Sequence, residues 1–120
     1  MEVTDLMIGD WCAYGVNCKG RVTALTDNLI TLSVDGNEIN GLYMLMPDMV
    51  NPIPLTEEIL VKNGWRKEST TIDGDYANWH GEIPICQEED EFNYERIELT
   101  YVHQLQHLLR LCGIDKEIEL

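Results

Sequence analysis

A proline-rich joint at residues 51–55 most constrains how this chain can fold. Pro52 and Pro54 hold the backbone around them extended, which excludes a helix across the joint and favours a boundary between two structural units. Thr56 follows at a position typical of a helix N-cap, with two glutamates in the first turn and Gly64 where the helix must end. The sequence therefore predicts a break after residue 51 and a short central helix beyond it.

Before the joint, short apolar runs alternate with turn residues. The runs at residues 7–14, 21–25 and 29–34 are rich in β-branched and aromatic side chains, and Gly, Asn and Asp separate them. A fourth strand is expected at residues 38–43. Strands this short, joined by tight turns, predict a small antiparallel β-sheet, flat or curled into a barrel.

After the joint, the pattern changes to a β-meander followed by a helix. Trp79 and residues 83–85 are expected in strands, with turns at residues 73–75 and 80–81. From Thr100 as the N-cap, apolar residues recur every three or four positions until Gly113, which predicts an amphipathic C-terminal helix. The polar side of that helix carries His103, Gln104, Gln106, His107 and Arg110.

Together these patterns predict an α+β fold built from two parts. Residues 1–51 form a small β-barrel-like unit, and residues 52–120 form an α+β unit with the central helix, the β-meander and the amphipathic helix. The two parts either fold separately or share one core. The exposed edges of a small sheet make a homodimer a further possibility, with residues 118–120 as the segment that pairs with another chain.

The net charge of the chain limits the classes of molecule that it is expected to bind. The 120 residues include 22 acidic and 8 basic side chains, a formal charge of −14, and 44% of them are hydrophobic, which is typical of a folded domain. An acidic surface repels phosphate groups, so we expect no direct contact with nucleic acid or an anionic membrane. An acidic N-terminus and the lack of a long apolar run predict a cytoplasmic protein with no membrane segment.

The sequence offers little to suggest catalysis. It has no nucleophile elbow around a serine and no glycine-rich phosphate loop, so we expect no enzyme and no cofactor. The cysteines are expected to be reduced, and Cys86 and Cys112 to be small buried side chains, because both follow or join apolar patterns. A pair of Cys12 or Cys86 with His80 remains an open alternative.

His103 and His107 lie four residues apart on the predicted helix, which is a metal-ligand spacing. A metal site would need further ligands, for which Glu95, Glu98 or His80 are the available side chains. No glutamate of the catalytic zinc motif lies between the two histidines. We therefore expect surface side chains and no bound metal.

An acidic run, Glu88, Glu89, Asp90 and Glu91, continues in the sequence to Glu95 and Glu98. Its plain interpretation is a solvated loop that leads into a strand. Its alternative is a docking surface for a basic partner, including the imitation of a row of DNA phosphates. The other candidate contact surface is the polar helix side, through Gln104, Gln106, His107 and Arg110.

Three segments carry a resemblance to a known family. They are Leu6-Met7-Ile8-Gly9-Asp10-Trp11, then Pro52-Ile53-Pro54-Leu55-Thr56-Glu57-Glu58-Ile59-Leu60 with Gly64-Trp65, and Tyr101-Val102-His103-Gln104-Leu105-Gln106. Together they resemble a family of short uncharacterised proteins of bacterial genomes, prophages and mobile elements, notably of Bacteroides-type gut anaerobes. In that family the position of His107 is often Asn, which argues against a metal site. The opening segment, followed by short strands, also resembles an SH3-like barrel.

The resemblance implies a biological setting and no mechanism. The preferred interpretation is an accessory protein of a prophage or mobile element that acts as a non-enzymatic protein-interaction module, with an unknown protein partner. The alternative is an acidic nucleic-acid mimic that binds a host DNA-binding protein.

Overall fold

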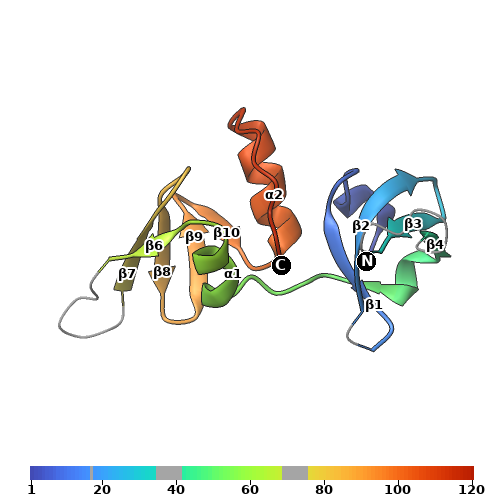
Figure 1. The fold of residues 1–120 in the computed structure, drawn as a ribbon, viewed down its shortest axis with the longest axis horizontal. Coiled ribbons are helices and arrows are strands. Elements are labelled where there is room, and N and C mark those ends of the chain that lie inside the picture. The colour runs from blue at the N-terminus through green and yellow to red at the C-terminus, as the bar shows by residue number, and fades with distance from the viewer. Residues whose placement is uncertain (17, 35–41, 69–75) are drawn as a thin grey trace. The chain divides into compact units, whose positions relative to one another are not determined.

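The extended joint divides the chain into two units, Met1–Ile53 and Pro54–Leu120, two residues beyond the expected break. The computed structural model describes residues 1–16, 18–34, 42–68 and 76–120 (Figure 1). It confirms the α+β class, with one antiparallel five-stranded sheet in each unit. The turn expected at residues 73–75 lies outside the described residues.

The N-terminal unit is a curled antiparallel sheet of short strands. Its elements are η1 (Val3–Asp5), β1 (Trp11–Tyr14), β2 (Cys18–Leu25), β3 (Ile30–Ser33), β4 (Leu42–Leu45), η2 (Pro47–Met49) and β5 (Val50–Asn51). The strand order is β4-β3-β2-β1-β5, and the 3-10 turn η2 leads into the last strand. β4 begins at Leu42, later than the expected residue 38, and residues 38–41 lie outside the described part of the chain.

Alternation along the strands builds the core of this unit. The buried side chains are those of Leu6, Cys12, Val22, Ile30, Leu32 and Val50. The Met1 ammonium donates to the carbonyls of Pro47 and Val50, at 2.8 and 3.0 Å, which holds the N-terminal segment against η2 and β5. The predicted burial of Cys86 and Cys112 was wrong, because both side chains are exposed, and Cys12 is the cysteine that lies in a core.

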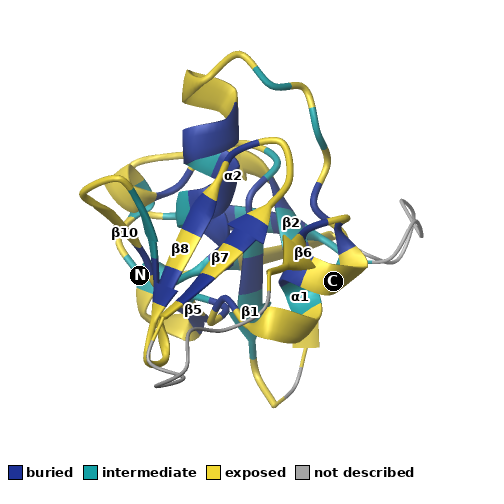
Figure 2. Ribbon diagram, turned by 90° about the vertical axis from the view of Figure 1, so that its left-hand side faces the viewer, coloured by how far each residue is buried: buried dark blue, intermediate teal, exposed yellow. Residues whose placement is uncertain are grey.

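The C-terminal unit has the expected order of helix, β-meander and helix, but residues 83–84, predicted in a strand, precede β8. Its elements are α1 (Glu57–Lys62), β6 (Arg66–Lys67), β7 (Tyr76–His80), β8 (Ile85–Glu88), β9 (Glu91–Tyr94), β10 (Ile97–Leu99) and α2 (Val102–Leu111). Sequential hairpins give the strand order β10-β9-β8-β7-β6. Figure 2 shows buried and exposed residues alternating along β7 and β8, which is the period of two that a sheet with one buried face requires.

Both helices begin with a defined cap. The Thr56 hydroxyl accepts a hydrogen bond from the Ile59 amide at 3.3 Å, as the sequence predicted, and Gly64 ends the turn with a φ of 93°. The second helix starts one residue later than expected, with Tyr101 as its N-cap. The reason is that Tyr101 forms a β-bridge with Pro54, and the side-chain oxygen of Gln104 accepts from the Tyr101 amide at 3.0 Å.

The last residues of the chain form neither a strand nor a frayed tail. Ile118 is buried, and the main chain of Glu119 is hydrogen-bonded to the side chain of Asn63. Residues 118–120, which we expected to pair with another chain, are therefore engaged within their own unit. Among the described residues, no helix is long and apolar enough to cross a membrane.

Candidate functional site

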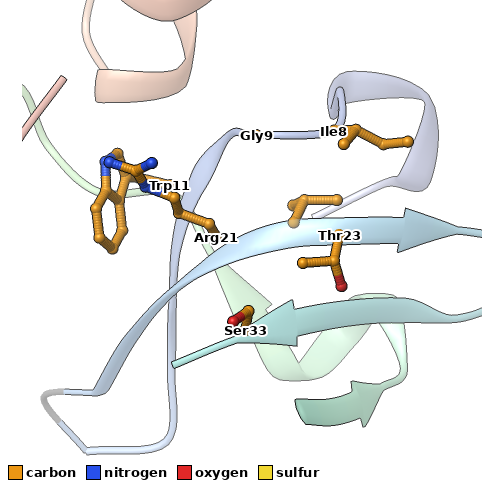
Figure 3. A pocket seen from close by; sticks show the side chains of 7 residues that line it. Ile8, Gly9, Trp11, Arg21, Thr23 and Ser33 are labelled. Carbon is orange, nitrogen blue, oxygen red and sulfur yellow. The ribbon is translucent and has the colours of Figure 1, made fainter. Parts of the chain in front are cut away.

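A hollow of about 510 Å³ opens on the outer face of the N-terminal sheet (Figure 3). Its lining comes from the loop before β1 and from the first three strands. The residues are Ile8, Gly9, Trp11, Arg21, Val22, Thr23 and Ser33. A surface hollow with apolar walls and a few polar groups has the composition of a binding site.

Strand register explains why three of these side chains meet. Trp11 is the Cα partner of Arg21, and Arg21 is the partner of Ser33, so the three lie in one row across β1, β2 and β3. The row continues to β4, where Leu42 is the partner of Ser33. Because Cys12 and Val22 point into the core, their neighbours Trp11 and Arg21 point to the outer face.

Trp11 and Arg21 form the centre of the hollow. The Arg21 guanidinium carbon lies 4.6 Å from the centroid of the Trp11 ring, within the range of a cation–π interaction. Figure 3 shows the guanidinium group next to the indole ring. The two side chains therefore present an aromatic surface and a fixed positive charge side by side.

A tight turn holds Ile8 at one end of the hollow. The Gly9 amide donates to the Val22 carbonyl at 2.7 Å, and Gly9 has a φ of 94°, which a residue with a Cβ rarely adopts. The Asp10 carboxylate accepts from the Met7 amide at 2.8 Å and closes the turn. The result is that Ile8, 66% exposed, is held by backbone hydrogen bonds rather than by burial of its own side chain.

Thr23 supplies the remaining wall from β2. It lies two residues after Arg21, so strand alternation places both side chains on the outer face, and the register against β3 shifts between Val22 and Ala24 beside it. The Thr23 hydroxyl donates to the Thr31 carbonyl at 3.3 Å. The polar side chains of the described lining are the Arg21 guanidinium and the Thr23 and Ser33 hydroxyls, which can donate hydrogen bonds to an acceptor group.

The acidic run lies in the other unit, on the β8–β9 hairpin. Glu88 and Glu91 are Cα partners, and Glu89 and Asp90 form the turn between them, with a φ of 55° at Glu89. All four side chains are exposed, and the Tyr76 hydroxyl donates to the Glu88 carboxylate at 3.2 Å. The expected loop is therefore a two-residue turn within a hairpin.

The acidic run does not continue in space as it does in the sequence. Glu95 lies in the β9–β10 turn, also with positive φ (54°), and Glu98 is the Cα partner of Asn93. The two turns lie at opposite ends of β9, about 10–13 Å apart for a four-residue strand. Among the described residues, the hairpin tip at 88–91 is thus a group of four acids separate from Glu95.

The polar side of α2 differs from the expected wet surface. His103 and Gln106 are buried. The Tyr101 ring stacks on the His103 ring, with their centroids 5.8 Å apart. Gln106 is four residues after Val102 and three before Leu109, so it lies on the same buried side of the helix as these two residues. Gln104 and His107 are half-buried. The Gln104 side chain also caps the helix, because its oxygen accepts from the Thr100 and Tyr101 amides. Arg110 is exposed. The role of Gln104, Gln106, His107 and Arg110 as a contact surface stays a prediction.

The two candidate metal ligands do touch each other. The His103 and His107 rings meet edge to face with centroids 5.5 Å apart. Across residues 1–16, 18–34, 42–68 and 76–120, the structure brings together no group of three or more His, Cys, Asp or Glu side chains able to hold a metal. Elsewhere His80 lies 3.3 Å from the Glu68 carboxylate, as an exposed pair.

Comparison with known proteins gives no match among family models, curated proteins or solved structures. The site is therefore assigned from its own geometry. The sequence contained one signal for it: Trp11 is adjacent in a strand to the apolar Cys12, and only one of two such neighbours can face the core. Arg21 could not be placed beside Trp11 without knowledge of the β1–β2 register.

Proposed function

We propose that this protein is a non-enzymatic protein-interaction module whose N-terminal unit binds a segment of a protein partner in the hollow around Trp11 and Arg21. The observation that carries the proposal is the cation–π pair of these two residues inside an apolar hollow on the outer face of the sheet. Trp and Arg are the side chains that most often dominate binding energy at protein interfaces.

Exposed apolar side chains of the N-terminal unit support binding of a protein segment. Four of the five methionines are exposed, and all four belong to the N-terminal unit: Met7, Met44, Met46 and Met49. Methionine is flexible and polarizable, and it is frequent on surfaces that adapt to apolar partners. Leu42 and Met44 extend the apolar outer face beyond Ser33. An apolar segment of a partner protein can therefore contact side chains on both sides of the row formed by Trp11, Arg21 and Ser33.

The chemistry of the hollow defines the segment it fits. An apolar side chain fits between Ile8 and the Trp11 ring, because both walls are hydrocarbon or aromatic surface. A neighbouring carbonyl or carboxylate meets the Arg21 guanidinium, which has five N–H donors in a fixed plane. We therefore expect an extended segment with an apolar residue next to an acceptor group.

Peptide selection tests this proposal. A random-peptide library selected on the full chain yields binders whose affinity falls at least about tenfold in Trp11→Ala, as expected for a central aromatic residue. Thr23→Arg fills the hollow and also abolishes binding. Val16→Ala, an exposed apolar residue of the same unit outside the hollow, leaves affinity unchanged. Peptides that bind wild type and Trp11→Ala equally well contradict the proposal.

The setting we propose rests on the family resemblance of the three sequence segments. It is that of an accessory protein of a prophage or mobile element that acts in the cytoplasm of its bacterial host. An acidic module of this kind binds host or phage proteins and avoids nonspecific contact with nucleic acid, because a charge of −14 repels phosphate.

A second candidate function is the acidic nucleic-acid mimic. Four exposed acids on one rigid hairpin tip favour it, with Glu88 directly opposite Glu91. The test is competition with duplex DNA for a pure basic DNA-binding protein such as a histone. The double variant Glu88→Gln and Glu91→Gln should lose competition, whereas Glu95→Gln with Glu98→Gln, at the other end of β9, should not. Equal loss in both variants indicates net charge alone and argues against mimicry.

A further inference from the structure

We infer that the segment bound in the hollow carries an acidic side chain, a Glu or an Asp, that lies against Lys19 and Arg21 of β2. This ligand is a special case of the segment in the proposed function, on which the inference rests. Residues 1–53 contain seven acidic side chains and two basic ones, and the two basic ones are Lys19 and Arg21. The only Lys and Arg side chains of a negatively charged unit are therefore two residues apart on a single strand.

Strand alternation places both basic side chains on the face that carries the hollow. Lys19 and Arg21 flank Gly20, which is buried, so both side chains point to the outer face of the sheet. Their Cα atoms lie about 7 Å apart, because a strand rises about 3.4 Å per residue. Arg21 lines the hollow opposite Trp11, and Lys19 lies opposite Ala13, the next outward position of β1. A second positive charge therefore lies next to the hollow.

The hydrogen-bond donors around Arg21 suit a carboxylate. The Arg21 guanidinium has its N–H donors in a fixed plane, and its contact with the Trp11 ring, at 4.6 Å, limits its orientations. Ser33, the Cα partner of Arg21 on β3, brings a hydroxyl to the same row, and Lys19 brings an ammonium group. Hydrogen bonds from cations to a carboxylate are roughly twice as strong as neutral ones. An acidic side chain therefore binds here more tightly than an amide of the same shape.

The net charge of −14 does not oppose this contact at close range. Exposed charges separated by more than about 8–10 Å are largely screened at physiological salt. Asp10, next to Trp11 in the sequence, is buried, and its carboxylate accepts from the Met7 amide. Asp27 lies beyond the end of β2, more than about 10 Å from Arg21. One carboxylate in a short apolar segment thus meets mainly the two cations, whereas nucleic acid, with a charge at every phosphate, also meets the rest of the negative surface.

Pairs of peptides test the inference by isothermal titration calorimetry of the full chain. Peptides selected from a random library for binding that depends on Trp11 should share a Glu or an Asp. Replacement of that peptide residue by Gln or Asn should weaken binding at least about tenfold, since it removes the charge and keeps the shape. The affinity of the acidic peptide should also fall as the salt concentration rises, whereas that of its amide version should not.

Lys19→Gln locates the contact on β2. Lys19 is exposed, so this variant keeps the fold, and it should weaken binding of the acidic peptide at least about threefold while leaving binding of the amide version unchanged. Arg96→Gln is the matched control, because it removes one positive charge from an exposed turn residue of the other unit. It should bind the acidic peptide as wild type does.

The outcomes separate this inference from the proposed function. Trp11-dependent peptides without an acidic residue, or equal binding of the acidic and amide peptides, overturn the inference and leave the proposed function standing. Binding of the acidic peptide by Lys19→Gln that is no weaker than that by Arg96→Gln also overturns the inference alone. Failure to find any Trp11-dependent peptide overturns both.

Discussion

The side chain of Asn63 forms a pair of hydrogen bonds with the main chain of Glu119, 56 residues further along the chain. The Asn63 amide nitrogen donates to the Glu119 carbonyl at 2.7 Å, and the Glu119 amide donates to the Asn63 oxygen at 2.7 Å. The same amide nitrogen donates to the Ile59 carbonyl at 2.8 Å. Asn63 thus ends α1 and holds the C-terminal segment next to it, where Ile118 is buried.

Asn63→Ala should therefore destabilise the protein by about 2 kcal/mol, since it removes three hydrogen bonds of a buried amide at roughly 1 kcal/mol or less each. Chemical denaturation monitored by circular dichroism measures the loss. Asn78→Ala is the control, because Asn78 is exposed and its amide reaches Glu68 only at 3.5 Å. Equal stability of Asn63→Ala and Asn78→Ala would show that the C-terminal segment is not held by this contact.

Gly81→Ala should destabilise through a clash with Trp65. A Cβ on Gly81 would lie 2.5 Å from the indole nitrogen, which donates to the Ile83 carbonyl at 2.9 Å inside the core. Forcing a buried ring to move costs about 1–3 kcal/mol. Thermal unfolding and Trp emission should both shift. Gly15→Ala is the control, because a Cβ on Gly15 would meet no atom within 4 Å. It should cost only about 1 kcal/mol, from the positive φ of Gly15, and should leave the fluorescence emission of Trp65 unchanged.

Thiol labelling should distinguish Cys12 from the other cysteines. Burial, with a smaller effect from the Asp10 carboxylate, raises the pKa of Cys12 to about 12. Cys18, Cys86 and Cys112 are exposed. Iodoacetamide at about pH 8 should modify these three in the native protein and Cys12 only after denaturant is added, as mass spectrometry of the peptides reports. Rapid native labelling of Cys12 would contradict the packing of the N-terminal core.

Glu57 should contribute to stability only above acidic pH. Hydrogen bonds from Gln87, at 2.9 Å, and Lys67, at 3.1 Å, lower the pKa of Glu57 below its ordinary value of 4.5. A carboxylate with a lowered pKa in the folded state stabilises above the unfolded pKa, and this effect disappears as pH falls through the folded pKa. Melting temperatures of wild type and Glu57→Gln should therefore differ at pH 7 and converge below about pH 4. A difference that persists at low pH would assign the effect to packing.

How much the sequence predicted depends on whether a feature is local. The joint, the α1 cap at Thr56 and the strands β1 to β3 were predictable because prolines, capping side chains and alternation act over a few residues, whereas the short strands β5, β6 and β10 were not predicted. The exposure of Cys112 was not, because the periodic pattern does not show that α2 ends at Leu111 and leaves Cys112 as its C-cap.

The hollow was not predicted because it depends on contacts between strands. Alternation indicates that Trp11 faces one side of its strand, but the register decides that Arg21 is its neighbour. The β-bulge beside Thr23, where the register shifts between Val22 and Ala24, has no signature in the sequence. The acidic run shows the reverse case: continuous in the sequence, it is divided between two hairpin turns by the positive φ of Glu89 and Glu95.

The most direct test of the proposed function maps a selected peptide onto the protein by NMR. Titration of the labelled full chain should shift the amides of Ile8, Gly9, Arg21 and Thr23 and the indole N–H of Trp11, while Glu88–Glu91 stay unchanged. Saturation of these shifts at a single dissociation constant, lost in Trp11→Ala, is the predicted result. Shifts confined to Glu88–Glu91 or to α2, with the hollow unaffected, would contradict the account.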